Sequence, residues 1–445
     1  MVLASITNPV KRKLQMNDIK HSIALLLAFC LLASFCNERK VQKPGDEALV
    51  VKAQAIHERV ISIDTHIDIE VSFITPEFYR GRQPEKLVTL PLMTEGGLDA
   101  AFFAVFSAQG PRTKEHYEKI NQEALEKIGE IQRAVQEVYP DQIELALHPE
   151  DVPRIHATGK KAAMIGMENG YPIGGDLAKL EEFHKLGCRY ITLCHNGHNQ
   201  ICDSQANYGG PASEHDGVSE FGKKVIVEMN RLGLIIDISH MSKKSMLDTA
   251  KLSRAPVIAS HSSCRELCDV ARNLDDEQLL ALKENGGVIH IVGFSEFIRS
   301  DPPEKVRALE DLRQEFHFPD EEEAFEKAVE EAPEDVKRSF LRRAEKIASR
   351  FPPASVKDLA DHIDHAVALI GIDHVGLSSD FYQSRFSLKG WKDAGETFNI
   401  TLELVRRGYT EEQIAKIWGG NCLRLWKEVE ETSEKITPHI ISRGD

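Results

Sequence analysis

The stretch Ile61-Ser62-Ile63-Asp64-Thr65-His66-Ile67-Asp68 alternates apolar and polar side chains. A period of two predicts a β-strand with one apolar face and one face that carries ionisable groups. His66 and Asp68 would project from the same face, about 6.7 Å apart along the strand. At that spacing the two side chains can hold one divalent cation together. A single His-x-Asp pair is more often an ordinary polar strand edge, so this interpretation depends on how the later strands end.

Seven further apolar segments alternate with amphipathic helices along the chain. Eight such units predict a parallel sheet with helices outside, closed into a (β/α)8 TIM-type barrel of the α/β class. An open, doubly wound sheet is the alternative, but it would bring fewer strand ends to one point. The seven further predicted strands cover residues 100–108, 162–167, 189–194, 234–238, 257–260, 288–292 and 374–378.

Ionisable residues stand at the ends of most predicted strands, where barrel enzymes place their chemistry. A mixture of imidazole and carboxylate ligands suits zinc or a similar divalent ion. If two ions bind, one carboxylate must bridge them, and Glu168 on the third strand is the natural candidate. Metal-activated water is hydroxide near neutral pH and can attack a carbonyl. The strand-end residues are His66, Asp68, Glu168, His195, His240, His261 and Asp380.

The composition is that of a soluble globular protein, and the charge argues against nucleic acid as a partner. Of its 445 residues, 42% are hydrophobic and 28% are charged, which is enough for a large core. The formal charge of −15 and the lack of a basic stripe argue against binding to nucleic acid. We expect a single barrel domain over residues 47–432. Residues 296–350, dense in Glu, Lys and Arg, predict a charged helical insertion after the seventh strand.

The N-terminus has the features of a targeting segment. Lys11-Arg12-Lys13 and Lys20 precede an apolar run from Ile23 to Phe35, as in a secretory signal. The run closes on Leu32-Ala33-Ser34-Phe35-Cys36, which resembles a bacterial lipoprotein cleavage site, although Phe35 replaces the expected small residue. Residues 1–36 therefore predict export, to the periplasm or to a bacterial membrane as a lipoprotein. The sequence leaves open whether Cys36 is lipidated, whether Cys264 and Cys268 form a disulfide, and whether the protein is a homodimer.

Eight motifs follow one another in the order found in a known family. In these motifs and their order the chain resembles the membrane dipeptidases (renal dipeptidase, peptidase M19) of the metal-dependent hydrolase superfamily. The motifs extend over roughly residues 55–430, and a chance match would not cover so much of the chain in the same order. The motifs are Asp64-Thr65-His66-Ile67-Asp68, Gly166-Met167-Glu168-Asn169-Gly170, Thr192-Leu193-Cys194-His195-Asn196, Asp237-Ile238-Ser239-His240, Ala259-Ser260-His261-Ser262-Ser263, Arg272-Asn273, Gly376-Leu377-Ser378-Ser379-Asp380 and Gly420-Asn421-Cys422-Leu423-Arg424.

The resemblance implies two zinc ions per chain, bridged by Glu168. One zinc would bind His66, Asp68 and Glu168, and the other Glu168, His240 and His261. His195 would face the scissile carbonyl oxygen, Arg272 would bind the substrate's terminal carboxylate, and Asp380 would handle protons and the substrate amine. The implied reaction is hydrolysis of dipeptides, with tolerance of D-residues on the C-terminal side. Asn169 stands where many relatives have glycine.

Physical reasoning supports these roles and leaves two alternatives. A dipeptidase must bind both termini of its substrate, and the planar guanidinium of Arg272 matches a carboxylate. Another barrel amidohydrolase, such as a deaminase or cyclic-amide hydrolase, would more often carry His-x-His and a modified Lys. An inactive binding protein on the same fold would usually have lost a ligand. We expect Asp64 to orient His66 and Asp237 to be structural.

Overall fold

A computed structural model describes residues 44–68, 86–206, 211–319, 322–381 and 387–441. The chain divides into two units, residues 1–52 and 53–445, and the fold described here is that of the second. The predicted targeting segment, residues 1–36, lies outside the described residues. Among the helices that are described, none combines the length and apolarity needed to cross a bilayer.

Nine strands form one sheet in the described residues, and every neighbouring pair is parallel. The order is β1-β2-β4-β5-β6-β7-β8-β9. Strand β3 pairs with β4 but is not part of this path. The backbone N–H of Asp380, just after β9, donates to His66 O of β1 at 3.0 Å and brings the two ends of the sheet together. The strands are β1 (Ile63–Asp68), β2 (Ala100–Phe106), β3 (Ile143–Leu145), β4 (Lys161–Glu168), β5 (Cys188–Thr192), β6 (Ile235–Asp237), β7 (Ile258–Ser262), β8 (Val288–Val292) and β9 (Val375–Ser378).

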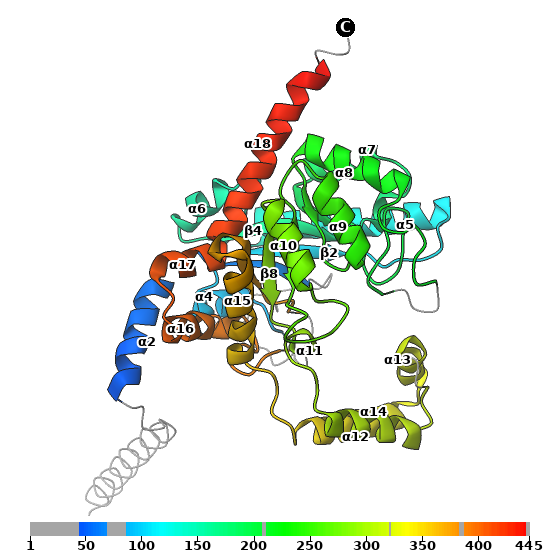
Figure 1. The fold of residues 1–445 in the computed structure, drawn as a ribbon, viewed down its shortest axis with the longest axis vertical. Helices are drawn as coiled ribbons and strands as arrows, with labels where there is room; N and C mark the ends of the chain where they lie inside the picture. Colours follow the sequence, from blue (N-terminus) through cyan, green and yellow to red (C-terminus); the bar gives the residue numbers. More distant parts are fainter. Residues whose placement is uncertain (1–43, 69–85, 207–210, 320–321, 382–386, 442–445) are drawn as a thin grey trace, which may run out of the picture. The chain divides into compact units, whose positions relative to one another are not determined.

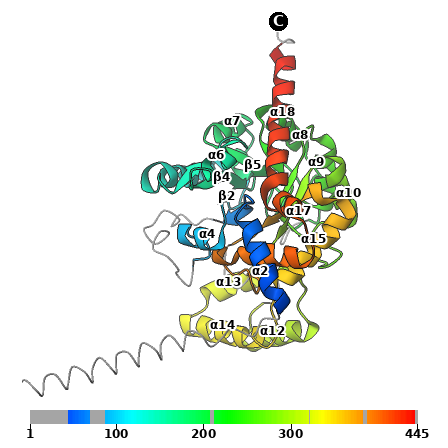
Figure 2. The same cartoon turned by 90° about the vertical axis from the view of Figure 1, so that its left-hand side faces the viewer.

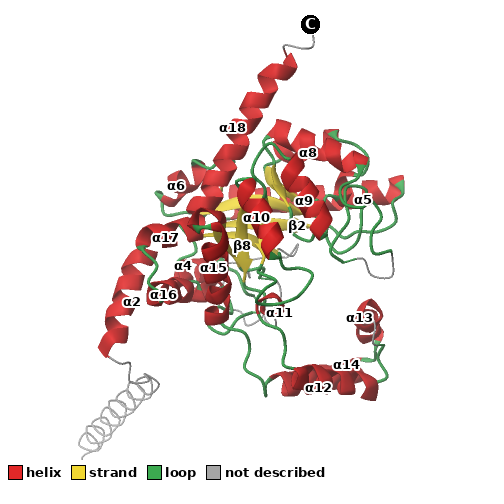
Figure 3. Ribbon diagram, in the orientation of Figure 1, coloured by secondary structure: helices red, strands yellow, loops and turns green. Residues whose placement is uncertain are grey.

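The helices that alternate with the strands lie around them in space, whereas those of residues 303–348 lie to one side (Figures 1, 2 and 3). This is the nearly closed (β/α)8 barrel that the alternating pattern predicts. The helices are α2 (Pro44–His57), α4 (Leu90–Gly96), α5 (Lys114–Arg133), α6 (Asp151–His156), α7 (Ala178–Lys185), α8 (Glu220–Leu232), α9 (Lys243–Leu252), α10 (Asp276–Glu284), α11 (Ser295–Ile298), α12 (Pro303–Glu315), α13 (Glu322–Glu331), α14 (Glu334–Ala348), α15 (Val356–Ile370), α16 (Phe398–Arg406), α17 (Glu411–Ala415) and α18 (Asn421–Ile441).

Local sequence sets the ends of the outer helices. Ser219 begins α8 because its hydroxyl accepts a hydrogen bond from the N–H of Gly222. Gly233 ends the same helix in the left-handed region, with φ 76°, a conformation that costs glycine little. Asp275 and Gln278 form a reciprocal capping box at the start of α10. These caps fix where the helices begin and end, and so limit the lengths of the strands between them.

Large aromatic side chains form part of the buried core. Phe102, Tyr190 and Trp426 belong to one buried cluster, with the Phe102 ring 5.0 Å from Tyr190 and 6.0 Å from Trp426. Gly166 makes room for Tyr190, since a Cβ at that position would lie 2.1 Å from the phenol ring. The backbone of β4 thus approaches Tyr190 closely, and Tyr190 can reach the first strand at the site described below.

The predicted insertion after the seventh barrel strand consists of α11 to α14. Its helices carry a small aromatic core of their own: the Phe340 ring lies 5.4 Å from Phe316, 5.1 Å from Phe318 and 5.6 Å from Phe325, in edge-to-face contacts. The guanidinium of Arg313 stacks 3.7 Å from the Phe325 ring centroid. The insertion is therefore a packed helical element as well as a charged one.

All eight predicted strands are present, with ends shifted by a few residues at most. The three-residue strand β3 was not predicted, because so short a segment has no readable alternation. Cys264 and Cys268 are buried free thiols, as are Cys188, Cys194, Cys202 and Cys422. The open choice between thiols and a disulfide at residues 264 and 268 is thus decided in favour of thiols.

Candidate active site

The predicted ionisable residues converge at the carboxyl ends of the strands. His66 and Asp68 end β1, Glu168 is the last residue of β4, and His261 lies in β7. His195, His240 and Asp380 follow β5, β6 and β9 within three residues. Carboxyl ends of parallel strands share one edge of a sheet, and barrel closure brings these ends around one centre.

Glu168 lies at the centre of this group. Its Oε1 is 3.0 Å from His240 Nε2 and 3.3 Å from His261 Nε2. Its Oε2 is 3.7 Å from His66 Nε2, which in turn is 3.7 Å from Asp68 Oδ1. The two oxygens of one carboxylate therefore face two different sets of ligand atoms, as a bridging carboxylate requires.

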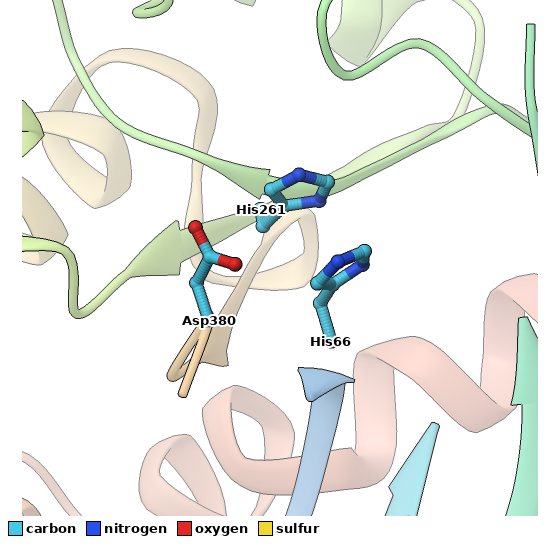
Figure 4. A group of neighbouring side chains, drawn as sticks. All are labelled: His66, His261 and Asp380. Atoms are coloured by element: carbon cyan, nitrogen blue, oxygen red, sulfur yellow. The ribbon is translucent and has the colours of Figure 1, made fainter. Parts of the chain in front are cut away.

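His195 and Asp380 border the same centre. His195 Nε2 lies 3.7 Å from Glu168 Oε1, and its ring packs edge-on against Phe106 at 4.9 Å. Figure 4 shows the Asp380 carboxylate beside the imidazoles of His66 and His261, and one ligand atom from each of these three lies within 4.8 Å of the others. Burial raises the pKa of Asp380 to about 7, helped by the nearby Asp68 and Glu168 charges and opposed by His66.

Electrostatics hold the central groups in the forms that bind metal ions. Burial would raise the pKa of Glu168, but the surrounding histidines hold it well below its usual value. Burial lowers the pKa of His240 and of His261 well below the histidine value, so both imidazoles are neutral. Burial would also lower the pKa of His66, but Glu168 and Asp68 raise it strongly. The carboxylates around His66 thus favour positive charge there, as a bound metal ion would supply.

The donor set fits divalent metal ions. His66 Nε2 and Asp68 Oδ1 are buried and have no hydrogen-bond partner among the described residues. The separations of 3.0 to 3.7 Å around Glu168 bracket about 3.3 Å, the edge of a tetrahedron with zinc–ligand bonds of about 2.0 Å. Glu168 belongs to two candidate ligand groups, which are Glu168, His240 and His261, and His66, Asp68 and Glu168.

Arg272 is a buried cation beside this centre. One nitrogen, Nη1, donates to Ser262 Oγ at 2.8 Å, while Nε and Nη2 have no partner among the described residues. The Phe297 ring lies 5.6 Å from the guanidinium carbon. Burial lowers the pKa of Arg272 from its usual value, and the charges of Asp380 and Glu168 partly restore it. A buried guanidinium with two free nitrogens can donate hydrogen bonds to a bound anion.

Strained backbone marks three of the strand ends. Asn169, His240 and Asp380 have φ values of 83°, 65° and 55°, in the left-handed region. Non-glycine residues in sparsely populated regions cost about 1–3 kcal/mol each and cluster at functional sites. Asn169 tolerates this conformation better than most residues other than glycine. Its side-chain oxygen also accepts from the N–H of Tyr171 at 3.1 Å.

The contacts of Asp64 differ from the predicted ones. Its Oδ1 accepts from the backbone N–H of His66 at 3.2 Å and of Ser379 at 2.9 Å, so it joins two strand ends and leaves the imidazole free. The hydroxyl of Tyr190 takes the orienting position instead, 2.8 Å from His66 Nδ1. Sequence reasoning missed Tyr190, although alternation on the strand at 189–194 puts it on the inward face with Thr192.

Comparisons with known proteins agree on one family. Residues 50–439 match the family model of membrane dipeptidases, peptidase family M19. The chain is 31% identical over 351 residues to dipeptidase tcpJ of Claviceps purpurea, which covers 78% of this chain and 70% of that protein. The probable dipeptidase PvdM of Pseudomonas aeruginosa is 32% identical, with a TM-score of 0.76 over 88% of this chain and 100% of that chain.

The fold is shared with more distant relatives. A metallopeptidase of Rhodobacter sphaeroides, solved with a phosphinate mimic of the dipeptide L-Ala-D-Ala, is 23% identical with a TM-score of 0.62, over 83% of this chain and 99% of that chain. The family model spans most of this chain and covers all the strand ends that form the candidate site. The chain therefore belongs to the membrane dipeptidase family, peptidase family M19.

Proposed function

We propose that this metallo-dipeptidase hydrolyses the peptide bond of free dipeptides with two zinc ions per chain, and that it tolerates a D-residue on the C-terminal side. The observation that carries the proposal is the position of Glu168, whose two carboxylate oxygens face two separate sets of ligand atoms. We assign His66, Asp68 and Glu168 to one ion and Glu168, His240 and His261 to the other. When bound, the ions supply an acidified water and polarise the carbonyl to be attacked.

Residues around the two ligand sets would bind the substrate at both ends. The free nitrogens of Arg272 are available for the terminal carboxylate, with which a guanidinium makes two parallel hydrogen bonds. His195, beside Glu168, would donate a hydrogen bond to the carbonyl oxygen as negative charge develops there. Asp380 would face the substrate amine with its carboxylate. A dipeptide satisfies these groups only if both of its termini are free.

Asp380 would move the proton that hydrolysis requires. The oxygen of water forms a bond to the carbonyl carbon, and Asp380 takes the proton that the water loses. When the C–N bond breaks, the same proton passes from Asp380 to the departing amine nitrogen, so the carboxylate returns to its starting form. His66, His261 and Asp380 also form a candidate metal group, so the assignment of Asp380 as proton carrier rests on the two ligand sets around Glu168 being complete without it.

The test is hydrolysis of a panel of L-L, L-D and Gly-D dipeptides by zinc-loaded protein, with cyclic amides and aminated heterocycles as comparison substrates. The proposal expects turnover of dipeptides, including those with a C-terminal D-residue. Relatives support that choice of panel, because the Rhodobacter sphaeroides structure holds a mimic of L-Ala-D-Ala. Turnover of the cyclic amides or heterocycles alone would identify another amidohydrolase. Metal binding without any turnover would identify a binding protein.

Arg272→Lys should lower kcat/KM on dipeptides about 10–100-fold, because a point charge replaces a two-pronged donor and a charge-assisted hydrogen bond is worth about 1.5–3 kcal/mol. Steady-state kinetics on a dipeptide and on its C-terminally amidated analogue check the reason for the loss. The amidated analogue offers no carboxylate, so its low activity should change little. An equal loss on both substrates would show that Arg272 does not bind the terminal carboxylate.

Export of the protein, with or without lipid attachment at Cys36, also stays a proposal. It is supported by the basic residues and the apolar run before Cys36. N-terminal sequencing of the native protein should find residues 1–35 removed. Full-length protein in the cytosol with these residues intact would contradict export. Lipid attachment has a separate test, since Cys36→Ser should release a lipoprotein from membranes and leave an unmodified exported protein where it was.

A further inference from the structure

A chain of buried hydrogen bonds runs from Asp237 to the imidazole of His261. Ser260 Oγ donates to Asp237 Oδ2 at 2.6 Å and lies 2.7 Å from His261 Nδ1. Asp237 and Ser260 have no exposed surface, and His261 is 1% exposed. These hydrogen bonds thus join a carboxylate to a predicted metal ligand through one hydroxyl, inside the protein and out of contact with water.

The carboxylate at the far end is saturated with donors. Asp237 Oδ1 accepts from the backbone N–H groups of Ser239 and Ser260 at 3.0 and 2.9 Å, and Oδ2 also accepts from Thr192 Oγ1 at 2.5 Å. Three donors other than the Ser260 hydroxyl are directed at its oxygens, so the carboxylate accepts and does not donate. The hydroxyl proton of Ser260 must therefore point toward Asp237.

This direction fixes the tautomer of His261. A serine hydroxyl has one proton, and that of Ser260 is already donated to Asp237. At 2.7 Å, the His261 Nδ1 must then be the donor and Ser260 Oγ the acceptor. The lone pair of His261 is left on Nε2, which faces Glu168 Oε1 at 3.3 Å and His240 Nε2 at 3.0 Å. That nitrogen is the one a metal ion would need.

The other two histidines are held differently. His240 Nδ1 lies 3.2 Å from the amide oxygen of Asn196, and His66 Nδ1 lies 2.8 Å from the phenol oxygen of Tyr190. An amide oxygen is a neutral acceptor, and a phenol can either donate or accept, so Tyr190 does not impose a tautomer. Of the three, only His261 is linked to a carboxylate by these contacts.

We propose that Asp237 and Ser260 are positioning residues that preset His261 to bind a metal ion at the group formed by Glu168, His240 and His261. Partners of this kind raise the basicity of a ligating imidazole and fix its orientation, and their loss typically weakens metal binding about 10–100-fold. The inference rests on the proposed function only in taking these three residues as metal ligands. Asp237 therefore acts on the site without touching metal or substrate.

The test measures zinc affinity in the absence of substrate, by competition with a chromophoric chelator. A His66→Ala background removes the other ligand group and isolates the group under test. Adding Ser260→Ala should weaken zinc binding about 10–100-fold. Adding Tyr190→Phe is the matched control: it also removes one buried hydroxyl, but its histidine partner is already absent, so the affinity should stay within about threefold. Unchanged affinity in the Ser260→Ala protein, or equal losses in both, would overturn the proposal.

Asp237→Asn provides a second readout, with an intact hydroxyl. An amide in place of Oδ2 donates to Ser260 Oγ and turns the hydroxyl toward His261 Nδ1, which moves the imidazole proton to Nε2. Long-range ¹H–¹⁵N correlation spectra of metal-free protein should place the His261 proton on Nδ1 in the unchanged chain and on Nε2 in the variant. A proton on Nε2 in the unchanged chain would refute the proposal without any variant having to fold. Zinc binding as expected without dipeptide turnover would refute the proposed function and leave this inference standing.

Discussion

Asp380→Asn should lower kcat about 10²–10⁴-fold, the usual contribution of a general acid–base group. The substitution keeps the shape of the side chain and removes its ability to take a proton from water and return it to the amine. Folding and zinc content should stay close to those of the unchanged protein, because Asp380 lies outside the two ligand groups centred on Glu168. Steady-state kinetics with elemental analysis of the same sample measure both quantities.

The control for Asp380 is Asp68→Asn. Asp68 lies in a proposed ligand group with His66 and Glu168, so its variant should lose metal first and activity as a consequence. Added zinc should then restore part of the activity of Asp68→Asn and none of that of Asp380→Asn. Asp380 also lies within reach of His66 and His261. If Asp380→Asn loses zinc and regains substantial activity when zinc is added, Asp380 is a ligand and not the proton carrier.

Glu168→Ala should remove both metal ions and abolish measurable dipeptide hydrolysis. The reason is geometric: Oε1 lies 3.0 Å from His240 Nε2 and Oε2 lies 3.7 Å from His66 Nε2, so both ligand groups lose their shared member. His66→Ala is the comparison, since it leaves Glu168, His240 and His261 together. Elemental analysis should find almost no zinc in Glu168→Ala and about half of the normal content in His66→Ala. Loss of the same single ion from both variants would contradict a bridging role.

The architecture could be predicted because its signals are local. Apolar segments that alternate with amphipathic helices define the barrel, and residues close to the helices in sequence, Ser219, Asp275 and Ser355, cap α8, α10 and α15. The strand-end pattern also brought together the expected residues. Alternation places a side chain on a face of a strand, and closure of the barrel carries those faces to a common centre.

The contacts between distant strands could not be predicted in this way. Tyr190 reaches His66 across the barrel because Gly166 gives it room. This contact depends on residues of three strands, so it cannot be predicted from the sequence of any one of them. Asp237 was expected to be structural, but its link to His261 runs through Ser260 on another strand. The aromatic core of the insertion depends likewise on which faces of α12, α13 and α14 meet.

The measurement that tests the account most directly is a zinc titration of metal-free protein during hydrolysis of a Gly-D dipeptide. The arrangement of ligands around Glu168 predicts that activity rises with added zinc and levels off at two ions per chain. Full activity at one ion per chain, or no hydrolysis at any zinc content in folded protein, would contradict it.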